Sequence, residues 1–164
     1  MLLSRRARRL VAASVVSVAT ACGGRQDPVR WTASLDGPAS VAPGGEARVV
    51  VSASPERGWY FYSLTQPAGG PTPARIWLAD SASFGSAGRV TGPEPSRSFD
   101  KTFSMNVEKH SSAASFIVPV RARPDARTGT ATILVSALFQ ACNDTICLSP
   151  RTVTLAVPVK IQPR

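Results

Sequence analysis

The chain has 164 residues and carries 19 Lys and Arg against 10 Asp and Glu, a formal net charge of +9. Four arginines lie in the first nine residues; from residue 22 onward 15 basic residues stand against 10 acidic ones, a net charge of +5. The basic residues are scattered and no aromatic side chains alternate with them, which argues against nucleic-acid binding. The remaining chain of about 140 residues suffices for one domain with one hydrophobic core.

The N-terminus has the pattern of an export signal. A basic head is followed by an apolar run from Leu10 to Ala21. That run is shorter than the roughly 20 residues that span a bilayer, and small residues end it. Residues 19–24, ATACGG, resemble a bacterial lipobox in which Cys22 becomes the lipid-modified first residue. We therefore predict a lipoprotein-type signal peptide over residues 1–21 and a lipid-anchored tether over 22–28, with ordinary cleavage near Ala21 as the alternative.

Export changes how the cysteines are interpreted, because an oxidising compartment favours disulfides. If Cys22 carries lipid, Cys142 and Cys147 form the remaining pair. Two cysteines and the single His110 do not make a four-ligand zinc site without carboxylates, so we predict no metal and no cofactor. We predict that His110 is a solvated loop residue. No nucleophile-elbow motif is present, which leaves a Ser-His-Asp hydrolase as a minor alternative.

From Val29 onward, short segments of alternating polarity are separated by clusters of Gly, Pro, Ser and Asp. The predicted strands lie near residues 31–35, 46–53, 59–63, 75–78, 116–122, 130–142 and 152–161. Pro119 cannot donate to a ladder, which favours an edge or bulged position for its strand. We find no amphipathic helix and no internal repeat. About seven to nine strands predict an all-β, immunoglobulin-like antiparallel β-sandwich over residues 29–164.

The two C-terminal cysteines lie at the tip of a predicted hairpin. Alternate residues from Ala131 to Ala141 form an apolar row, and residues 143–145, Asn-Asp-Thr, favour a turn. The hairpin tip is thus bridged, or can be bridged, by Cys142 and Cys147. On this alternation Cys142 points away from the apolar row, and we predict that a partner can reach it.

Three segments carry a family resemblance. They are GWYFYS at residues 58–63, FIVPV at 116–120, and FQAC through CLSP at 139–150. In this order the chain resembles the N-terminal periplasmic domain of the bacterial thiol:disulfide interchange protein DsbD. The cysteine hairpin followed by a proline and a Val/Leu strand is the most specific of the three.

The resemblance implies an immunoglobulin-like sandwich with a redox-active cysteine pair at one end. Such a pair accepts electrons from a membrane-embedded partner and passes them to periplasmic thioredoxin-like proteins. Cys142 and Cys147 match the active cysteines, and Tyr60 and Tyr62 match aromatic positions beside them. Members of the family also shield the sulfurs with a cap loop that carries an aromatic residue. Residues 99–103 are its expected counterpart, with Phe103 as the shielding residue.

The chain departs from the family in two respects. Four residues separate its cysteines, one fewer than in the best-known member. The sequence also shows neither the transmembrane carrier nor the thioredoxin domain of the full protein, so we expect a separate membrane electron carrier.

Two functions follow from these expectations. The first is a thiol–disulfide oxidoreductase domain, anchored through Cys22 on the periplasmic side of a bacterial membrane. The alternative is a non-catalytic immunoglobulin-like binding lipoprotein with a structural disulfide, which would contribute only about 2 kcal/mol. Arg151 is the nearest candidate cation to the pair and Asp144 opposes it, so we expect no strongly activated thiolate.

Overall fold

The structure, a computed structural model, describes residues 27–79 and 82–163. Cys22, the predicted signal peptide and most of the predicted tether lie outside this range. All regular structure in this range is β-strand. The described residues contain no helix that is long and apolar enough to cross a membrane. The strands are β1 (Val29–Leu35), β2 (Ser40–Val41), β3 (Glu46–Pro55), β4 (Tyr60–Tyr62), β5 (Arg75–Leu78), β6 (Phe84–Ser86), β7 (Ser96–Asp100), β8 (Met105–His110), β9 (Ala114–Ala122), β10 (Gly129–Phe139), β11 (Ala141–Cys142) and β12 (Arg151–Ile161).

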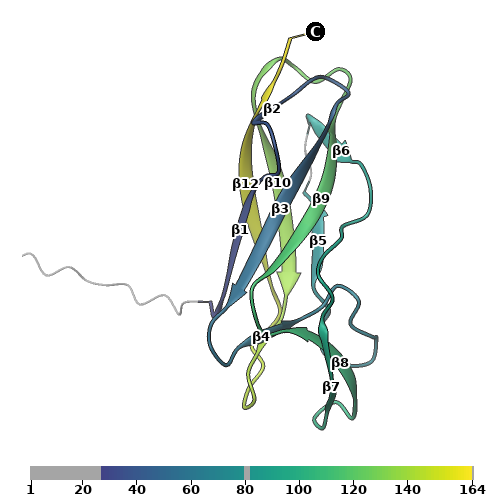
Figure 1. Cartoon of the computed structure of the whole chain (residues 1–164), viewed down its shortest axis with the longest axis vertical. Helices are drawn as coiled ribbons and strands as arrows, with labels where there is room; N and C mark the ends of the chain where they lie inside the picture. The colour runs from purple at the N-terminus through teal and green to yellow at the C-terminus, as the bar shows by residue number, and fades with distance from the viewer. Residues whose placement is uncertain (1–26, 80–81, 164) are drawn as a thin grey trace, which may run out of the picture.

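The strands form three sheets of four. One has the order β1-β3-β9-β6 and a second the order β2-β12-β10-β5, and these two make the sandwich (Figure 1). The third, β11-β4-β8-β7, lies at the end of the sandwich opposite the C-terminus (Figure 1). All pairings are antiparallel except that of β12 with the short β2. The predicted immunoglobulin-like β-sandwich is confirmed.

Buried and exposed side chains alternate along the strands, and the buried ones show which side of each strand faces the core. On β10 the inward side chains Ile133, Val135, Ala137 and Phe139 are fully buried, and the strand pairs with β12 along its whole length. Trp31 of β1 lies against Phe139, with ring centroids 5.1 Å apart. The apolar row predicted from the sequence is therefore the inner face of the second sheet, with Ala131 half-buried at its end.

The prediction of an edge or bulge at Pro119 is wrong. Pro119 lies within β9, opposite Arg48 of β3, and β9 has neighbours on both sides. The Pro119 carbonyl accepts a hydrogen bond from Ala87 N at 3.0 Å, on the side away from β3. N and O of one residue point to the same side of a strand. The missing N–H of Pro119 therefore costs the β3–β9 ladder nothing.

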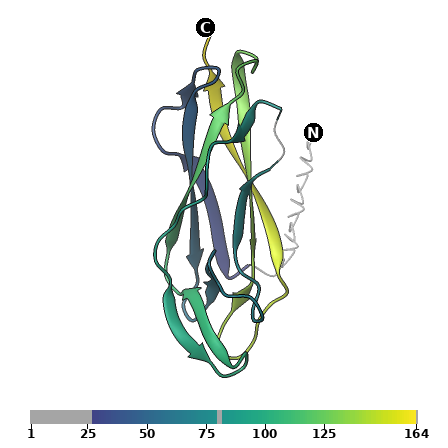
Figure 2. The same cartoon turned by 90° about the vertical axis from the view of Figure 1, so that its right-hand side faces the viewer.

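The sequence predicts no strand between Phe99 and Val107, where the chain forms the hairpin of β7 and β8. This hairpin projects beyond the sandwich at the end that also carries the cysteines (Figures 1 and 2). His110 ends β8, is 7% exposed and lies 5.2 Å from Phe61 and 5.7 Å from Phe116 by ring centroids. The prediction of a solvated loop residue is therefore wrong for His110, because β8 adds to β4 and turns the imidazole inward.

Candidate active site

Cys142 and Cys147 form a disulfide with an S–S distance of 2.02 Å at the tip of a tight hairpin. Asn143 shapes the turn between them. Its Oδ1 accepts hydrogen bonds from Thr145 N at 2.9 Å and Ile146 N at 2.8 Å, and its N–H donates to Ile146 O at 2.9 Å. A short side chain that bonds its own backbone favours such a turn, which holds the two cysteines opposite each other.

The two cysteines differ in exposure. Cys142 is 0% exposed, whereas Cys147 is exposed. The prediction that a partner can reach Cys142 is wrong, because the outer side of the hairpin is not solvent at this point. β10 ends at Phe139, and after Gln140 the chain continues as β11, which pairs with β4 in the third sheet. Cys142 there joins a second small core with Tyr60, Tyr62 and Val107.

Tyr60 and Tyr62 lie on the side of β4 that faces this second core. The Tyr60 hydroxyl donates to Asn143 O at 3.3 Å, and Lys109 Nζ lies 4.4 Å from the centre of the Tyr60 ring. The Tyr62 ring meets that of Tyr60 edge-on at 5.7 Å. Burial raises the pKa of both phenols, so both remain protonated. The Tyr62 hydroxyl is buried and makes no hydrogen bond of regular geometry among the residues described, although the neighbouring Tyr60 hydroxyl interacts with it and contributes to its raised pKa.

The turn between β7 and β8 covers the second core from the other side. Asp100 Oδ1 accepts from Thr102 N at 2.8 Å and Phe103 N at 3.3 Å, and Ser104 takes a left-handed conformation, φ 53°. This geometry places the half-buried Phe103 ring edge-on to Tyr62, with centroids 6.5 Å apart. We call residues 96–110 the cap hairpin.

A cleft of about 410 Å³ separates the cap hairpin from the cysteine hairpin. Its lining includes Cys147, both tyrosines, Phe103 and Lys109. Two exposed apolar side chains also line it, Phe99 at 63% and Ile146 at 44%. Neither Ile146 nor Lys109 was predicted from the sequence as a site residue. An isoleucine in an otherwise polar turn was a usable signal for the first, whereas the position of Lys109 depends on the pairing of β8 with β4.

Arg151 does not serve the cysteine pair as a cation. Its guanidinium forms an ion pair with Asp27, Nη1 to Oδ2 at 3.2 Å. The cleft instead carries Lys101 and Lys109 together with Asp100 and Asp144. These two positive and two negative charges balance, so the cleft supplies no net positive charge that would stabilise a thiolate.

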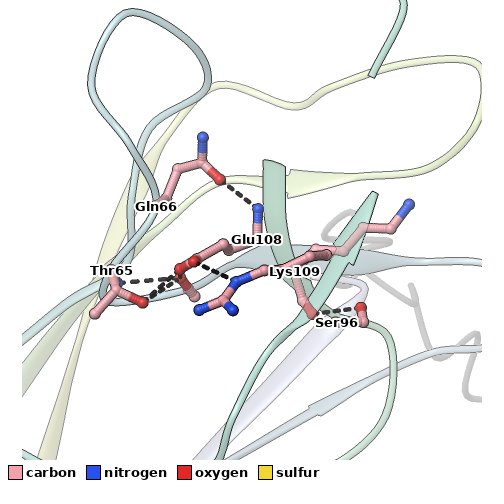
Figure 3. Close-up of polar contacts among 7 residues, drawn as sticks. Thr65, Gln66, Ser96, Glu108 and Lys109 are labelled. Carbon is pink, nitrogen blue, oxygen red and sulfur yellow. Dashed lines mark hydrogen bonds and ion pairs between the residues drawn. The ribbon is translucent and has the colours of Figure 1, made fainter. Parts of the chain in front are cut away.

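A polar network anchors the cap hairpin to the chain that follows Tyr62 (Figure 3). Glu108 accepts hydrogen bonds from Ser63 Oγ at 3.0 Å and from the Thr65 hydroxyl, and pairs with Arg97 Nε at 2.9 Å. Its backbone N–H donates to Gln66 Oε1 at 2.7 Å. The Thr65 hydrogen bond, helped by those from Arg97 and Ser63, lowers the pKa of the Glu108 carboxyl against its desolvation. Both strands of the hairpin are thus tied to one ionised carboxylate.

No group of three or more His, Cys, Asp or Glu side chains that could hold a metal ion occurs in the described part of the chain. The site therefore consists of a disulfide with one exposed and one buried cysteine, two protonated tyrosines, and an apolar-rimmed cleft. The fold and the site together make this chain an immunoglobulin-like domain with a partly accessible disulfide at one end.

The family is identified by sequence. Residues 34–158 match the family described as thiol:disulfide interchange protein DsbD, N-terminal, and the chain belongs to that family. The resemblance found in the three segments is confirmed. This membership and the bonded cysteine pair support a thiol:disulfide interchange domain. No curated protein matches the chain.

Comparison with solved structures gives two partial matches. One is the N-terminal periplasmic domain of ScsB from Proteus mirabilis, 14% identical, with 81% of this chain and 45% of that chain covered and a TM-score of 0.48. The other is a family 123 glycoside hydrolase from Clostridium perfringens, 8% identical, with 84% and 28% covered and a TM-score of 0.36. The chain spans less than half the length of either.

Proposed function

We propose that this chain is an exported thiol–disulfide interchange domain. It relays electrons through a reversible Cys142–Cys147 disulfide, from a separate membrane electron carrier to periplasmic thioredoxin-like proteins. The observation that carries the proposal is the unequal exposure of the two cysteines beside an open cleft. A purely structural disulfide needs neither an accessible sulfur nor a cleft beside it.

The exposure of Cys147 supports the following reaction sequence. A thiolate of the reduced donor attacks Sγ of Cys147, the Cys142–Cys147 bond breaks, and Cys142 leaves as a thiolate that takes up a proton. The donor's second thiolate then attacks the donor sulfur of the mixed disulfide and releases Cys147 as a thiolate, which also takes up a proton. Two electrons and two protons have entered the domain. In the second half-reaction the Cys147 thiolate attacks the disulfide of an oxidised thioredoxin-like protein, and Cys142 resolves the mixed disulfide.

The surroundings of the pair fit a selective exchange site. Cys147 lines the cleft together with the cap hairpin and the two buried tyrosines, so that a partner docked in the cleft reaches this cysteine. Phe99 and Ile146 give the cleft an apolar rim for a docking protein. A small reductant needs only access to the sulfur, whereas a protein partner also gains from this apolar contact.

The proposed location follows from the N-terminal sequence and the family. We propose that residues 1–21 are removed as a lipoprotein signal, that Cys22 is lipid-modified, and that residues 22–28 tether the domain on the periplasmic side of the membrane. Labelling cells with a fatty acid tests this, because wild type should carry the label and Cys22→Ser should lose it. A labelled Cys22→Ser variant or an unlabelled wild type would contradict the anchor but leave the redox proposal intact.

The decisive measurement for exchange is the reduction potential of the pair, by equilibration in glutathione or dithiothreitol buffers. Exchange catalysts lie between roughly −180 and −270 mV, and we expect a value in this range. A value below about −300 mV indicates a structural disulfide. That result would favour the alternative, a non-catalytic immunoglobulin-like binding lipoprotein.

Trapping identifies the attacked sulfur. Cys142→Ala leaves the accessible Cys147 without its resolving partner, so mixed disulfides with thioredoxin-like proteins should accumulate. Cys147→Ala is the matched control, since its remaining cysteine is buried, and it should accumulate few. Equal trapping by both variants would contradict the proposed order of attack.

A further inference from the structure

A second hollow, separate from the redox cleft, lies on the other side of the cap hairpin. Successive residues of β8 face opposite ways, so that Lys109 lines the redox cleft while Glu108 and His110 line this groove. The groove holds about 680 Å³, and buried Ile76 and Phe116 contribute to its apolar lining. This volume is within the range of ligand-binding sites.

One wall of the groove is a free strand edge. β5 is the last strand of its sheet and pairs only with β10. Ala79 N donates to Leu134 O of β10 at 2.8 Å, whereas Ala74 N donates to Ser63 O at 3.0 Å on the opposite side. Backbone groups alternate along a strand, so the N–H and C=O of Ile76 point to the same side as those of Ala74. No backbone partner for Ile76 occurs on that side within the described ranges.

The groove lining carries three arginines against two glutamates, Glu94 and Glu108, a net charge of +1. Arg75 and Arg89 are exposed, and in the described part of the chain neither has an ion pair or a side-chain hydrogen bond. Arg97 is different, because Glu108 holds its guanidinium, and Glu94 further raises its pKa. Two guanidiniums thus remain free to meet carboxylates.

His110 adds an unpaired polar group at the inner end of the groove. Its imidazole is 7% exposed and has ring contacts with Phe61 and Phe116, but no hydrogen-bond partner among the residues described. Burial lowers its pKa, so the ring is neutral and offers one donor and one acceptor nitrogen. The His110 nitrogens are not among the side-chain atoms buried without a partner, so a ligand atom in the groove can form a hydrogen bond with the imidazole.

We propose that this groove binds an extended acidic segment of a partner protein. The segment pairs its backbone with the free edge of β5, places alternate apolar side chains toward Ile76 and Phe116, and directs carboxylates to Arg75 and Arg89. A small anion would use the guanidiniums alone, whereas strand addition uses the edge, the apolar lining and the charges together. The site is distinct from the disulfide and does not require redox activity.

A labelled peptide of alternating Val and Glu, capped at both ends, tests the proposal by fluorescence anisotropy with the full domain. We expect saturable binding that weakens with salt. Arg75→Gln and Arg89→Gln should each weaken binding about threefold, and the double variant about tenfold. Arg57→Gln is the matched control, because Arg57 is an exposed arginine in the turn before β4 and should leave binding unchanged.

Two altered peptides make the test decisive. A peptide with Lys in place of Glu should not bind, and one methylated at its central backbone nitrogens should bind at least tenfold more weakly, because it cannot pair with an edge. Equal binding of either peptide, or no loss on Arg75→Gln and Arg89→Gln, would overturn the proposal. Cys147→Ala should bind the acidic peptide as wild type does, which separates this outcome from the redox measurements.

Discussion

Cys142 and Cys147 share one disulfide but lie in opposite environments, the first fully buried against two tyrosines and the second exposed at the hairpin tip. Only one end of the bond can therefore be attacked from outside. In the proposed exchange the buried sulfur of Cys142 is the leaving group, and its stability as thiol or thiolate depends on the second core. The reduction potential should accordingly respond to changes in that core more than to changes at the surface.

Tyr62→Phe tests this dependence. Apart from its interaction with Tyr60, the Tyr62 hydroxyl makes no hydrogen bond of regular geometry among the described residues while the disulfide is formed, and reduction creates a sulfur acceptor within the same cluster. Loss of a hydrogen bond present only in the reduced form destabilises that form by about 1 kcal/mol. The potential should then become about 20 mV more negative, measured in glutathione buffers.

Tyr60→Phe is the control for this shift. Its hydroxyl already donates to Asn143 O at 3.3 Å in the oxidised form. We expect a smaller change in potential and a loss of stability of about 1 kcal/mol, measured by denaturant unfolding. An unchanged potential in Tyr62→Phe, or an equal shift in both variants, would count against the hydroxyl as a donor to sulfur.

Glu108→Gln tests the anchoring of the cap hairpin. The substitution keeps the shape of the side chain but removes the charge that Ser63, Thr65 and Arg97 contact. Hydrogen bonds to charged groups contribute about 1.5–3 kcal/mol, so the hairpin should open more often and the domain should lose stability. We expect reduction by dithiothreitol to become about two- to fivefold faster, measured by stopped flow, because local opening exposes the disulfide.

Glu46→Gln supplies the comparison for Glu108→Gln. It removes an exposed ion pair with Arg121 on the sandwich, far in the fold from the cap hairpin. Its effect on stability should stay below about 1 kcal/mol, and its reduction rate should match wild type. If Glu108→Gln lowered the melting temperature without accelerating reduction, the network would be structural only.

Removal of the apolar rim should separate protein partners from small reductants. Phe99→Ser and Ile146→Ser take away exposed apolar surface at the cleft. Exchange with a thioredoxin-like protein should slow about fivefold or more, whereas reduction by dithiothreitol should change little, because only the protein gains from docking. Trp77→Ser, at a side chain that is 40% exposed on β5, is the matched control. Equal slowing in the control would contradict a specific rim.

The sequence predicted what local periodicity determines. Alternation along β10 and β12 identifies the inner row that includes Ile133 and Phe139, and the turn residues from Asn143 onward identify the cysteine hairpin. The segments around Tyr60 and Cys142 also identified the family. These features depend on neighbours in the chain, and a single sequence contains them.

The errors concern contacts between distant segments. Alternation placed Cys142 on an outer face, but β4 and the cap hairpin cover that face. His110 was predicted in solvent because nothing local shows that β8 adds to β4. Pro119 was predicted at an edge because its own residue type does not reveal on which side β9 pairs with β3. In each case the third sheet or the strand order, not the local pattern, decided the environment.

His110 predicts a pH dependence of stability. Burial lowers its pKa below the ordinary value of 6.5, so the unfolded chain binds the proton more readily than the folded one. Neutral His110 therefore causes no loss of unfolding free energy above pH 6.5. As the pH falls from 6.5 to the lowered pKa of the folded state, proton uptake by the unfolded chain reduces the unfolding free energy. Wild type should lose unfolding free energy between pH 7 and 5, with a slope of at most about 1.4 kcal/mol per pH unit, measured by urea denaturation.

His110→Phe isolates this contribution. It keeps an aromatic ring between Phe61 and Phe116 but cannot take up a proton. Glu108 lies close enough to raise the His110 pKa slightly against burial, but its own lowered pKa puts its titration below the ordinary value of 4.5, outside the measured range. The free energy of unfolding should therefore be flatter between pH 7 and 5 in the variant than in wild type. Parallel curves would show that another group titrates in this range.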